Sequence, residues 1–247
     1  MKILLTNDDG YRAKGIKILE KSLKDYGDVY VAAPYKNMSA CSSSLSVHSK
    51  VNIISKDDRH YVIKGTPADC IHLLSRGIMQ SLPDIVFSGI NFGSNLGDDV
   101  IYSGTVAGAI EGRFCKYSPV AISIVSREPK YLNDIDSKMN FILSYIFKNI
   151  PKLNTILNIN IPDIPFSKIK GIKYTILGNR NISMRPIITK SSYKIHGEIG
   201  AVGKPLFSSK ETDFNAIKDK YISFTPITIN MHDTKSIKNK VIKNNKR

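Results

Sequence analysis

Residues 2–23 read KILLTNDDGYRAKGIKILEKSL and contain the signals that decide the fold class. The apolar run at residues 2–5 is typical of a buried strand, and it stops at the polar segment TNDDG at residues 6–10. Apolar residues then recur at helical spacing up to Gly27, which predicts an amphipathic helix. A buried strand followed by such a helix is the first half of a βαβ unit.

The same alternation of apolar runs and helical patterns continues along the chain. Further buried strands are predicted at residues 29–33, 85–87, 120–125 and 156–161, with helices at 68–79, 105–116 and 135–146. Residues 51–54 and 61–63 are typical of a hairpin. Strands separated by helices of this length indicate parallel βαβ units, so we expect an α/β three-layer sandwich around a mostly parallel sheet.

A different pattern begins near residue 171. Residues 171–177 and 221–229 alternate like antiparallel strands, and the chain at 178–215 has scattered Gly, Ser and Pro without a helical period. We therefore expect three parts: an α/β core at residues 1–177, a β-rich extension at 178–230 that returns to the core, and a basic tail at 231–247.

Composition argues against several classes of protein. The chain has 36 Lys and Arg against 21 Asp and Glu, for a formal net charge of +15. Part of this charge lies in residues 235–247, and aromatic residues do not interleave with the basic ones, so nucleic-acid binding is not indicated. No apolar run approaches the ~18 residues of a membrane span, and we expect no membrane partner.

The cysteine content indicates a reducing compartment. Cys41, Cys70 and Cys115 are odd in number and far apart, without a CxxC motif, so neither a disulfide framework nor a thiolate zinc site is expected. The first 15 residues lack the apolar stretch of a signal peptide. We therefore expect a cytoplasmic protein.

Polar segments directly after strands are the candidates for chemistry, because ligands of an open parallel sheet bind outside the carboxyl ends of its strands. Asp8 and Asp9 are adjacent carboxylates at such a position. A divalent cation would offset their repulsion, and Gly10 would allow a tight turn. The alternative is a carboxylate that caps the following helix. Two other Asp pairs, at residues 57–58 and 98–99, are explained by turn and loop hydrogen bonds.

Residues 88–105, SGINFGSNLGDDVIYSGT, form the segment richest in candidate ligands. It begins at a strand end, holds four glycines and runs into a helix, so its amides and the hydroxyls of Ser103 and Thr105 could cradle a phosphate. It lacks the GxGxxG and GxxxxGK[ST] motifs, and a capped glycine-rich loop is the alternative. With Asn91, the carboxylates suit Mg²⁺, Mn²⁺ or Ca²⁺ and predict metal-assisted phosphate chemistry.

These residues stand in an ordered set of motifs. The set comprises NDDG (7–10), APYKNMS (33–39), GTPADC (65–70), SGIN (88–91), NLGDD (95–99), YSGTV (102–106), NINIP (158–162) and TDF (212–214). In this set, and over most of residues 1–230, the chain resembles the SurE family of 5'(3')-nucleotidases. The resemblance implies a Rossmann-like core, hydrolysis of nucleoside 5'- and 3'-monophosphates, and one divalent cation per subunit, Mg²⁺ or Mn²⁺. It also implies a homodimer or homotetramer in which C-terminal segments are exchanged.

The resemblance assigns roles at matching positions. It implies metal ligands at Asp8, Asp9, Ser39 and Asn91, and phosphate contacts from Asn95, Ser103, Gly104 and Thr105. The chain also departs from the family pattern. It has Ala40 and Lys220 where the family usually has Gly, Lys14 where it usually has Pro, and no Trp near Tyr193.

Our hypothesis for the reaction is attack on phosphorus by a metal-activated water, with Asp8 or Asp9 as the base and the choice between them open. Short-chain polyphosphate is a further candidate substrate. Two other classes are considered. A non-catalytic nucleotide or RNA sensor would use the same cradle, and an NAD-dependent oxidoreductase is disfavoured because GxGxxG is absent.

Overall fold

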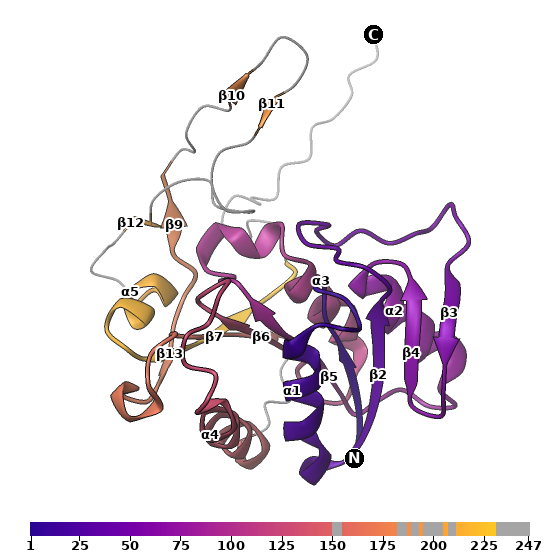
Figure 1. Ribbon diagram of the computed structural model, residues 1–247, viewed down its shortest axis with the longest axis horizontal. Helices are drawn as coiled ribbons and strands as arrows, with labels where there is room; N and C mark the ends of the chain where they lie inside the picture. The colour runs from indigo at the N-terminus through magenta and orange to yellow at the C-terminus, as the bar shows by residue number, and fades with distance from the viewer. Residues whose placement is uncertain (150–154, 182–186, 189–192, 195–204, 207–210, 231–247) are drawn as a thin grey trace, which may run out of the picture.

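Nine strands form one sheet at the centre of the molecule, in the order β3-β4-β2-β1-β5-β6-β7-β13-β8 (Figure 1). The computed structural model describes residues 1–149, 155–181, 187–188, 193–194, 205–206 and 211–230. The strands of the sheet are β1 (Lys2–Thr6), β2 (Asp28–Pro34), β3 (Asn52–Lys56), β4 (His60–Lys64), β5 (Ile85–Phe92), β6 (Val120–Ile124), β7 (Ile156–Ile161), β8 (Ile172–Tyr174) and β13 (Ile222–Ile227).

The central strands of the sheet are parallel. β4, β2, β1, β5, β6 and β7 all run in one direction, whereas β3 is antiparallel to β4 and β13 is antiparallel to β7. The β3–β4 pair confirms the predicted hairpin. β1 lies between β2 and β5, so the chain leaves β1 toward one edge and later returns to its other side. Such a reversal of strand order leaves a crevice at the carboxyl ends of the two strands.

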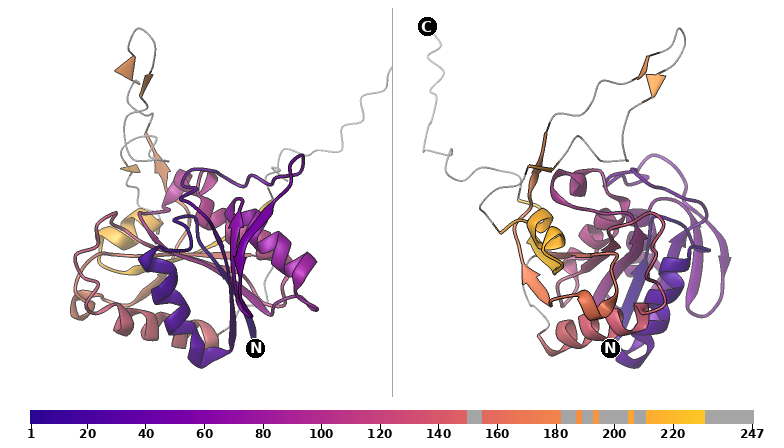
Figure 2. Two further views of the ribbon diagram at one scale, coloured as in Figure 1. Left: turned by 45° about the vertical axis from the view of Figure 1, so that its right-hand side comes forward. Right: turned by 60° about the vertical axis from the view of Figure 1, so that its left-hand side comes forward.

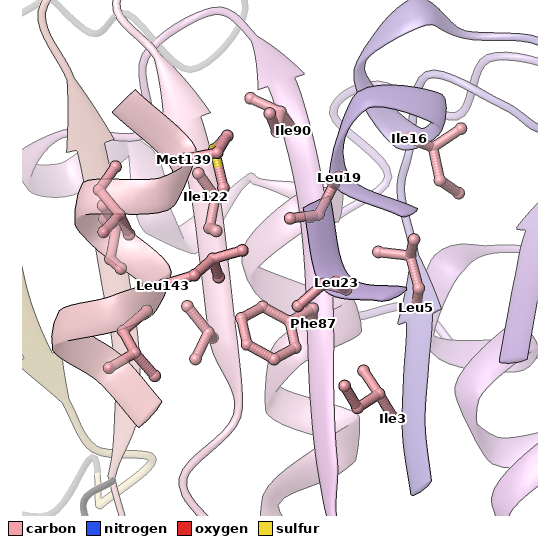
Figure 3. Close-up of a cluster of buried hydrophobic side chains, with 14 of the residues drawn as sticks. Ile3, Leu5, Ile16, Leu19, Leu23, Phe87, Ile90, Ile122, Met139 and Leu143 are labelled. Carbon is pink, nitrogen blue, oxygen red and sulfur yellow. The ribbon is translucent and has the colours of Figure 1, made fainter. Parts of the chain in front are cut away.

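Helices cover both faces of the sheet (Figures 1 and 2). α1 (Lys14–Leu23) and α4 (Ile135–Lys148) pack on one face, and α2 (Pro67–Leu73) and α3 (Gly104–Glu111) pack on the other. Ile3 and Leu5 of β1 join the core under α1, shown in Figure 3, whereas Leu4 joins the core under α2. This alternation follows from the two-residue period of a strand. The predicted three-layer α/β sandwich is therefore confirmed.

Local sequence signals set the start of the helices. Thr66 accepts a hydrogen bond from the Asp69 backbone N–H through Oγ1 at 3.1 Å, and Asp69 Oδ2 accepts from the Thr66 N–H at 2.9 Å. This capping box, with Pro67 in the first turn, begins α2. None of the helices in the described part of the chain combines the length and the apolar character that a membrane span needs.

One strand is longer than the sequence indicates. The apolar run predicts a strand at residues 85–87, but β5 continues to Phe92. Ser88 and Gly89 interrupt the apolar pattern, yet both are buried between β1 and β6. The pairing of β5 with β6 also shifts in register between Ser88 and Asn91. A small hydroxyl and a glycine fit a crowded sheet interior, and a hydropathy pattern cannot detect such a position.

The C-terminal part differs from the expected antiparallel pair. β8 and β13 are parallel to each other, because the chain crosses over between them and passes through α5 (Asp213–Lys218). β13 makes its antiparallel contact with β7 instead. The described residues of the expected extension also hold two antiparallel pairs of two-residue strands, β9 (Asn179–Arg180) with β12 (Pro205–Leu206) and β10 (Ile187–Ile188) with β11 (Tyr193–Lys194). The division of the chain at residues 177 and 230 stays a prediction, and the basic tail at 231–247 lies outside the described residues.

Candidate active site

Segments that follow β1, β2, β5 and β6 surround a cavity of about 330 Å³. The cavity is therefore located at the carboxyl ends of the parallel strands, beside the reversal point between β1 and β5. Its walls are formed by Asp8, Asp9, Asn37, Ser39, Ala40, Asn91, Phe92, Gly93, Ser94, Asn95, Asp99, Tyr102, Ser103 and Arg127. Carboxylates, amides and hydroxyls predominate in this set, so the cavity is suited to a polar ligand.

A tight turn after β1 presents the two adjacent carboxylates. Gly10 has a φ of +99°, in the region that favours glycine, and Asn7 Nδ2 donates to the Gly10 carbonyl at 3.0 Å. The Asp8 carbonyl accepts from the Met38 N–H at 2.7 Å, which ties this turn to the loop after β2. Asp8 is 4% exposed and Asp9 is partly exposed.

Burial raises the pKa of both carboxyl groups. Asp8 has a raised pKa because burial penalises its charged form, and this effect exceeds the opposing effect of the Thr105 hydroxyl, which donates to Asp8 Oδ1 at 2.5 Å. Burial, followed by the neighbouring charge of Asp8, raises the pKa of Asp9 to about 6. Two carboxylates in this environment repel each other, and a cation between them would relieve that cost.

The loop after β2 brings a serine to the cavity. The backbone N–H and the hydroxyl of Ser39 both donate to Asn37 Oδ1, at 2.7 and 2.6 Å. Because the hydroxyl acts as a donor here, its oxygen lone pairs stay available to a cation. The next residue, Ala40, has a φ of +59°, and Lys220 has a φ of +69°. Both departures from the usual Gly of the family thus fall at left-handed positions, which carry a steric cost for any side chain.

The GTPADC motif anchors the same loop. Asp69 accepts hydrogen bonds from the backbone N–H and the hydroxyl of Ser46, both at 2.8 Å, in addition to its role in the α2 capping box. The Thr66 hydroxyl donates to the Ser44 carbonyl at 2.8 Å. The motif therefore holds residues 44–46 of the loop after β2 in place, and none of its residues lines the cavity.

The segment after β5 supplies two amides. Asn91 Nδ2 donates to the Gly93 carbonyl at 2.8 Å, which leaves its Oδ1 available as an acceptor or ligand. Asn95 is buried, and its Nδ2 donates to the Ser123 hydroxyl at 2.7 Å, while its backbone N–H donates to Asn160 Oδ1 at 2.9 Å. Asn91 is thus held by the loop that follows its own strand, and Asn95 is held by β6 and β7.

The amino end of α3 lies against Asp8. Ser103 caps the helix through its Oγ, which accepts from the Val106 N–H at 3.0 Å, so its hydroxyl hydrogen can be donated to a ligand. A Cβ at Gly104 would lie 2.7 Å from the Asp8 Cβ, so only glycine permits this close approach. The helix dipole adds a favourable potential for an anion at this end.

Six of the eight residues assigned by resemblance line the same cavity. They are Asp8, Asp9, Ser39, Asn91, Asn95 and Ser103. Gly104 and Thr105 do not line it; they lie behind Asp8, where Gly104 permits the close contact and Thr105 donates its hydroxyl to the carboxylate. The phosphate contacts expected from these two residues stay predictions.

Sequence reasoning missed a buried ion pair at the cavity wall. The Asp99 carboxylate accepts from Arg180 Nε at 2.9 Å and from Nη2 at 2.5 Å, and the two side chains are 5% and 9% exposed. Loop hydrogen bonds were expected for residues 98–99, and the structure adds this ion pair with Arg180 of β9. The only sequence signal was the carboxylate itself, because nothing in the spacing links these distant positions.

The donor set fits a hard divalent cation. Across the described residues, no three or more His, Cys, Asp or Glu side chains gather as a metal cluster would. Asp8 and Asp9 line the cavity together and would be the charged ligands of a cation bound there. The neutral oxygens of Ser39 and Asn91 line the same cavity. Two carboxylates with neutral oxygens and water suit Mg²⁺ or Mn²⁺. Cys41 is unsuited to this site, because burial and the charge of Asp8 raise the pKa of its thiol to about 11.

Comparison with known proteins identifies relatives over nearly the whole chain. The model of the family described as Survival protein SurE matches residues 3–184. The chain is 44% identical over 227 residues to the 5'-nucleotidase SurE of Vesicomyosocius okutanii subsp. Calyptogena okutanii (strain HA), covering 92% of this chain and 91% of that protein. It is 43% identical over 235 residues to the 5'-nucleotidase SurE of Histophilus somni (strain 2336), covering 94% of each.

A solved structure supports the same assignment. The crystal structure of the SurE protein from Aquifex aeolicus is similar to this chain with a TM-score of 0.80 and 37% sequence identity, and the match covers 94% of this chain and 95% of that chain. The family match spans more than half of the sequence, and the fold agrees over almost all of it. The chain therefore belongs to the SurE family.

Proposed function

We propose that the protein is a 5'-nucleotidase, which hydrolyses nucleoside monophosphates to nucleoside and phosphate in the cavity beside β1 and β5. The observation that carries this proposal is the contact between the adjacent carboxylates and the amino end of α3, where a Cβ at Gly104 would collide with Asp8. A cation site and an anion site are thereby next to each other, as phosphate-ester hydrolysis requires. The two similar proteins named 5'-nucleotidase SurE support the same reaction.

The two carboxylates differ in their surroundings, which suggests different roles. Asp8 is buried, and its Oδ1 is held by the Thr105 hydroxyl, so it suits a fixed ligand. Asp9 is more exposed, and among the described residues no side chain forms a hydrogen bond to its carboxylate, whose pKa is raised to about 6. We assign Asp9 as the group that accepts the proton of the attacking water. The Ser103 hydroxyl and the first amides of α3 would hold the phosphoryl oxygens.

A single divalent cation, Mg²⁺ or Mn²⁺, completes the proposed site. Asp8, Asp9, Ser39 and Asn91 would hold it, and when bound it supplies charge neutralisation and a more acidic water. The raised pKa values of both carboxyl groups support this assignment, because burial penalises their charged forms and a bound cation would offset that penalty.

We also propose that the protein associates with itself. The β10–β11 pair lies away from the central sheet and from the helices that cover it (Figure 2), which leaves it accessible to a second copy. Light scattering on the purified protein should give the molar mass of a dimer or tetramer, and a monomer at micromolar concentration would contradict this part. A cytoplasmic location rests on the cysteine content and is proposed on that basis.

The nucleotidase proposal is tested by a phosphate-release screen over 5'- and 3'-mononucleotides and short-chain polyphosphate. Protein stripped with a chelator should be inactive, and Mg²⁺ or Mn²⁺ should restore release. Asp9→Asn should abolish it, whereas Asp58→Asn, in the exposed pair of the β3–β4 turn, should leave it unchanged. Full activity of Asp9→Asn in excess metal would contradict the proposal, and nucleotide binding without phosphate release would favour the sensor.

A further inference from the structure

Arg127 lines the cavity but is neither a proposed metal ligand nor the proposed base. It is the only Lys or Arg among the cavity-lining residues of the described chain. Its side chain is exposed, and no carboxylate of the described residues forms an ion pair or hydrogen bond with its guanidinium. A guanidinium that no described carboxylate pairs with, on the wall of a cavity that would receive an anion, is available to the ligand.

The backbone holds Arg127 at this wall. The Ser126 N–H donates to the Ile124 carbonyl at 2.7 Å, which closes a three-residue turn directly after β6. The Gly93 N–H donates to the same carbonyl at 3.0 Å and joins this turn to the end of β5. Farther along the loop, Asp163 accepts from two backbone N–H groups at 2.9 and 3.1 Å. The loop is thus anchored on both sides of Arg127.

The side chain leaves this turn along the cavity wall. A Cβ on Gly93 would lie 3.9 Å from Arg127 Cγ, so the aliphatic stem passes beside a residue without a side chain. Gly93 also accepts from Asn91, one of the residues proposed to hold the cation. The stem of the Arg127 side chain therefore lies next to the proposed metal site, on the β6 side of the cavity.

A count of charges at the cavity identifies what Arg127 can bind. Asp99 is neutralised by Arg180, and a divalent cation would neutralise Asp8 and Asp9. Arg127 is then the remaining charge on the wall, and it is positive. A phosphate monoester is a dianion near neutral pH, so this charge is complementary to the substrate and not to any carboxylate of the protein.

We propose that Arg127 binds the phosphate group of the substrate from the β6 side of the cavity, through the paired N–H groups of its guanidinium. This inference rests on the proposed nucleotidase function. The planar fork of a guanidinium matches two phosphate oxygens, which a lysine ammonium cannot do in the same way. Arg127 is thus a substrate-binding residue, and it acts together with the amino end of α3 on the phosphoryl oxygens.

The test measures binding of inorganic phosphate by calorimetry to the full chain in Mg²⁺, for the wild type, Arg127→Gln and Arg127→Lys. Lys148→Gln, an exposed change on α4, is the matched control. We expect Arg127→Gln to weaken phosphate binding by roughly 10- to 100-fold, Arg127→Lys to recover part of this, and the control to stay within about twofold. Adenosine binding should not change, and KM for AMP should rise more than kcat falls.

Two results would overturn the proposal. Phosphate affinity within about twofold of wild type in Arg127→Gln, with an unchanged thermal midpoint, would show that the guanidinium does not meet the phosphate. An equal loss of adenosine affinity would assign Arg127 to the nucleoside instead. Wild-type protein that binds phosphate but releases none from AMP would refute the nucleotidase function alone, since the phosphate titration would still decide the role of Arg127.

Discussion

Removal of the Arg180 guanidinium should lower the free energy of unfolding by more than the loss of a surface ion pair does. The side chains of Asp99 and Arg180 are 5% and 9% exposed, and they meet through two parallel hydrogen bonds of 2.9 and 2.5 Å. Breaking such a buried pair by removing one partner costs about 3–5 kcal/mol, because the remaining charge is left without compensation. We therefore expect Arg180→Met to lower the free energy of unfolding by about this amount.

Methionine isolates the guanidinium in this experiment. The backbone N–H of Arg180 donates to Asp98 Oδ2 at 2.7 Å, and this bond is kept in the variant. The Arg180 guanidinium also lies 4.9 Å from the centre of the Phe214 ring, where an apolar side chain can still pack. Most of the expected loss of stability thus comes from the buried Asp99 carboxylate, which no longer has the guanidinium beside it.

Urea denaturation of the metal-free protein measures the effect, and two further variants make it decisive. Asp99→Asn in the Arg180→Met background removes the buried negative charge and should recover at least half of the lost stability. Arg59→Met breaks an exposed pair with Asp28 at 3.0 Å and should cost less than about 1 kcal/mol.

Two outcomes would refute the reasoning. One is a decrease in the free energy of unfolding of less than about 1 kcal/mol in Arg180→Met. The other is a variant with both Arg180→Met and Asp99→Asn that is no more stable than Arg180→Met alone. Either result would mean that the Asp99 carboxylate can remain at the cavity wall without the Arg180 guanidinium at little cost in stability. Because Asp99 lines the cavity, we also expect KM for nucleotides to rise in Arg180→Met through repulsion of the phosphate.

Three further sets of substitutions test the close packing at Gly104, two left-handed backbone angles and the charge of Asp9. Gly104→Ala places a Cβ 2.7 Å from that of Asp8, so kcat/KM for nucleotides should fall by about tenfold or more as the carboxylate is displaced. Ala40→Gly and Lys220→Gly relieve left-handed backbone angles, and each should raise the free energy of unfolding by about 1 kcal/mol in urea denaturation. Asp9→Asn should stabilise the chelated protein at pH 7.5 by at most about 3 kcal/mol, and this gain should vanish near pH 3.5.

The sign of the last effect follows from the direction of the pKa shift. The folded-state pKa of Asp9, about 6, lies above its ordinary value of 3.8, so the folded protein holds the proton more tightly than the unfolded chain. Ionisation of Asp9 therefore lowers stability as the pH rises from about 4 to about 6, and asparagine removes this loss. An equal gain at both pH values would contradict the assignment to ionisation.

Controls for the glycine and alanine changes are available in the same chain. Gly77→Ala meets only Leu73 Cδ1 at 3.6 Å, an ordinary contact, and should leave activity unchanged. Activity of Gly104→Ala equal to that of the control would contradict the close packing of α3 against Asp8. A loss of stability in Ala40→Gly would show that the left-handed angle carries no strain that glycine can relieve.

The parts of the fold that follow from local order could be predicted from the sequence. An apolar run before Asp8 and Asp9 indicated the end of a buried strand, and in a parallel sheet all such ends meet at one edge. The rule that the carboxyl ends of parallel strands meet was enough to predict Asn91 near the two carboxylates, and all three side chains line one cavity. The same rule selected the serine-containing loop after residues 29–33, and the family pattern singled out Ser39 among its serines.

Long-range features could not be predicted in this way. Arg180 and Asp99 are 81 residues apart, and their pairing depends on how β9 returns to the cavity. Likewise, the direction of β13 is set by the crossover through α5, which a strand pattern does not record. Arg127 follows β6 and could have been singled out by the strand-end rule, but a single basic residue in a loop is a weak signal.

The most direct test of the central claim is a count of bound Mn²⁺ by electron paramagnetic resonance. We expect one ion per chain in the wild type and in Asp58→Asn, whose carboxylate lies in the exposed β3–β4 turn. Asp8→Asn should bind Mn²⁺ at least about 100-fold more weakly, since it loses one of only two charged ligands. Mn²⁺ binding by Asp8→Asn at wild-type affinity would contradict the claim that these carboxylates form the metal site of a nucleotidase.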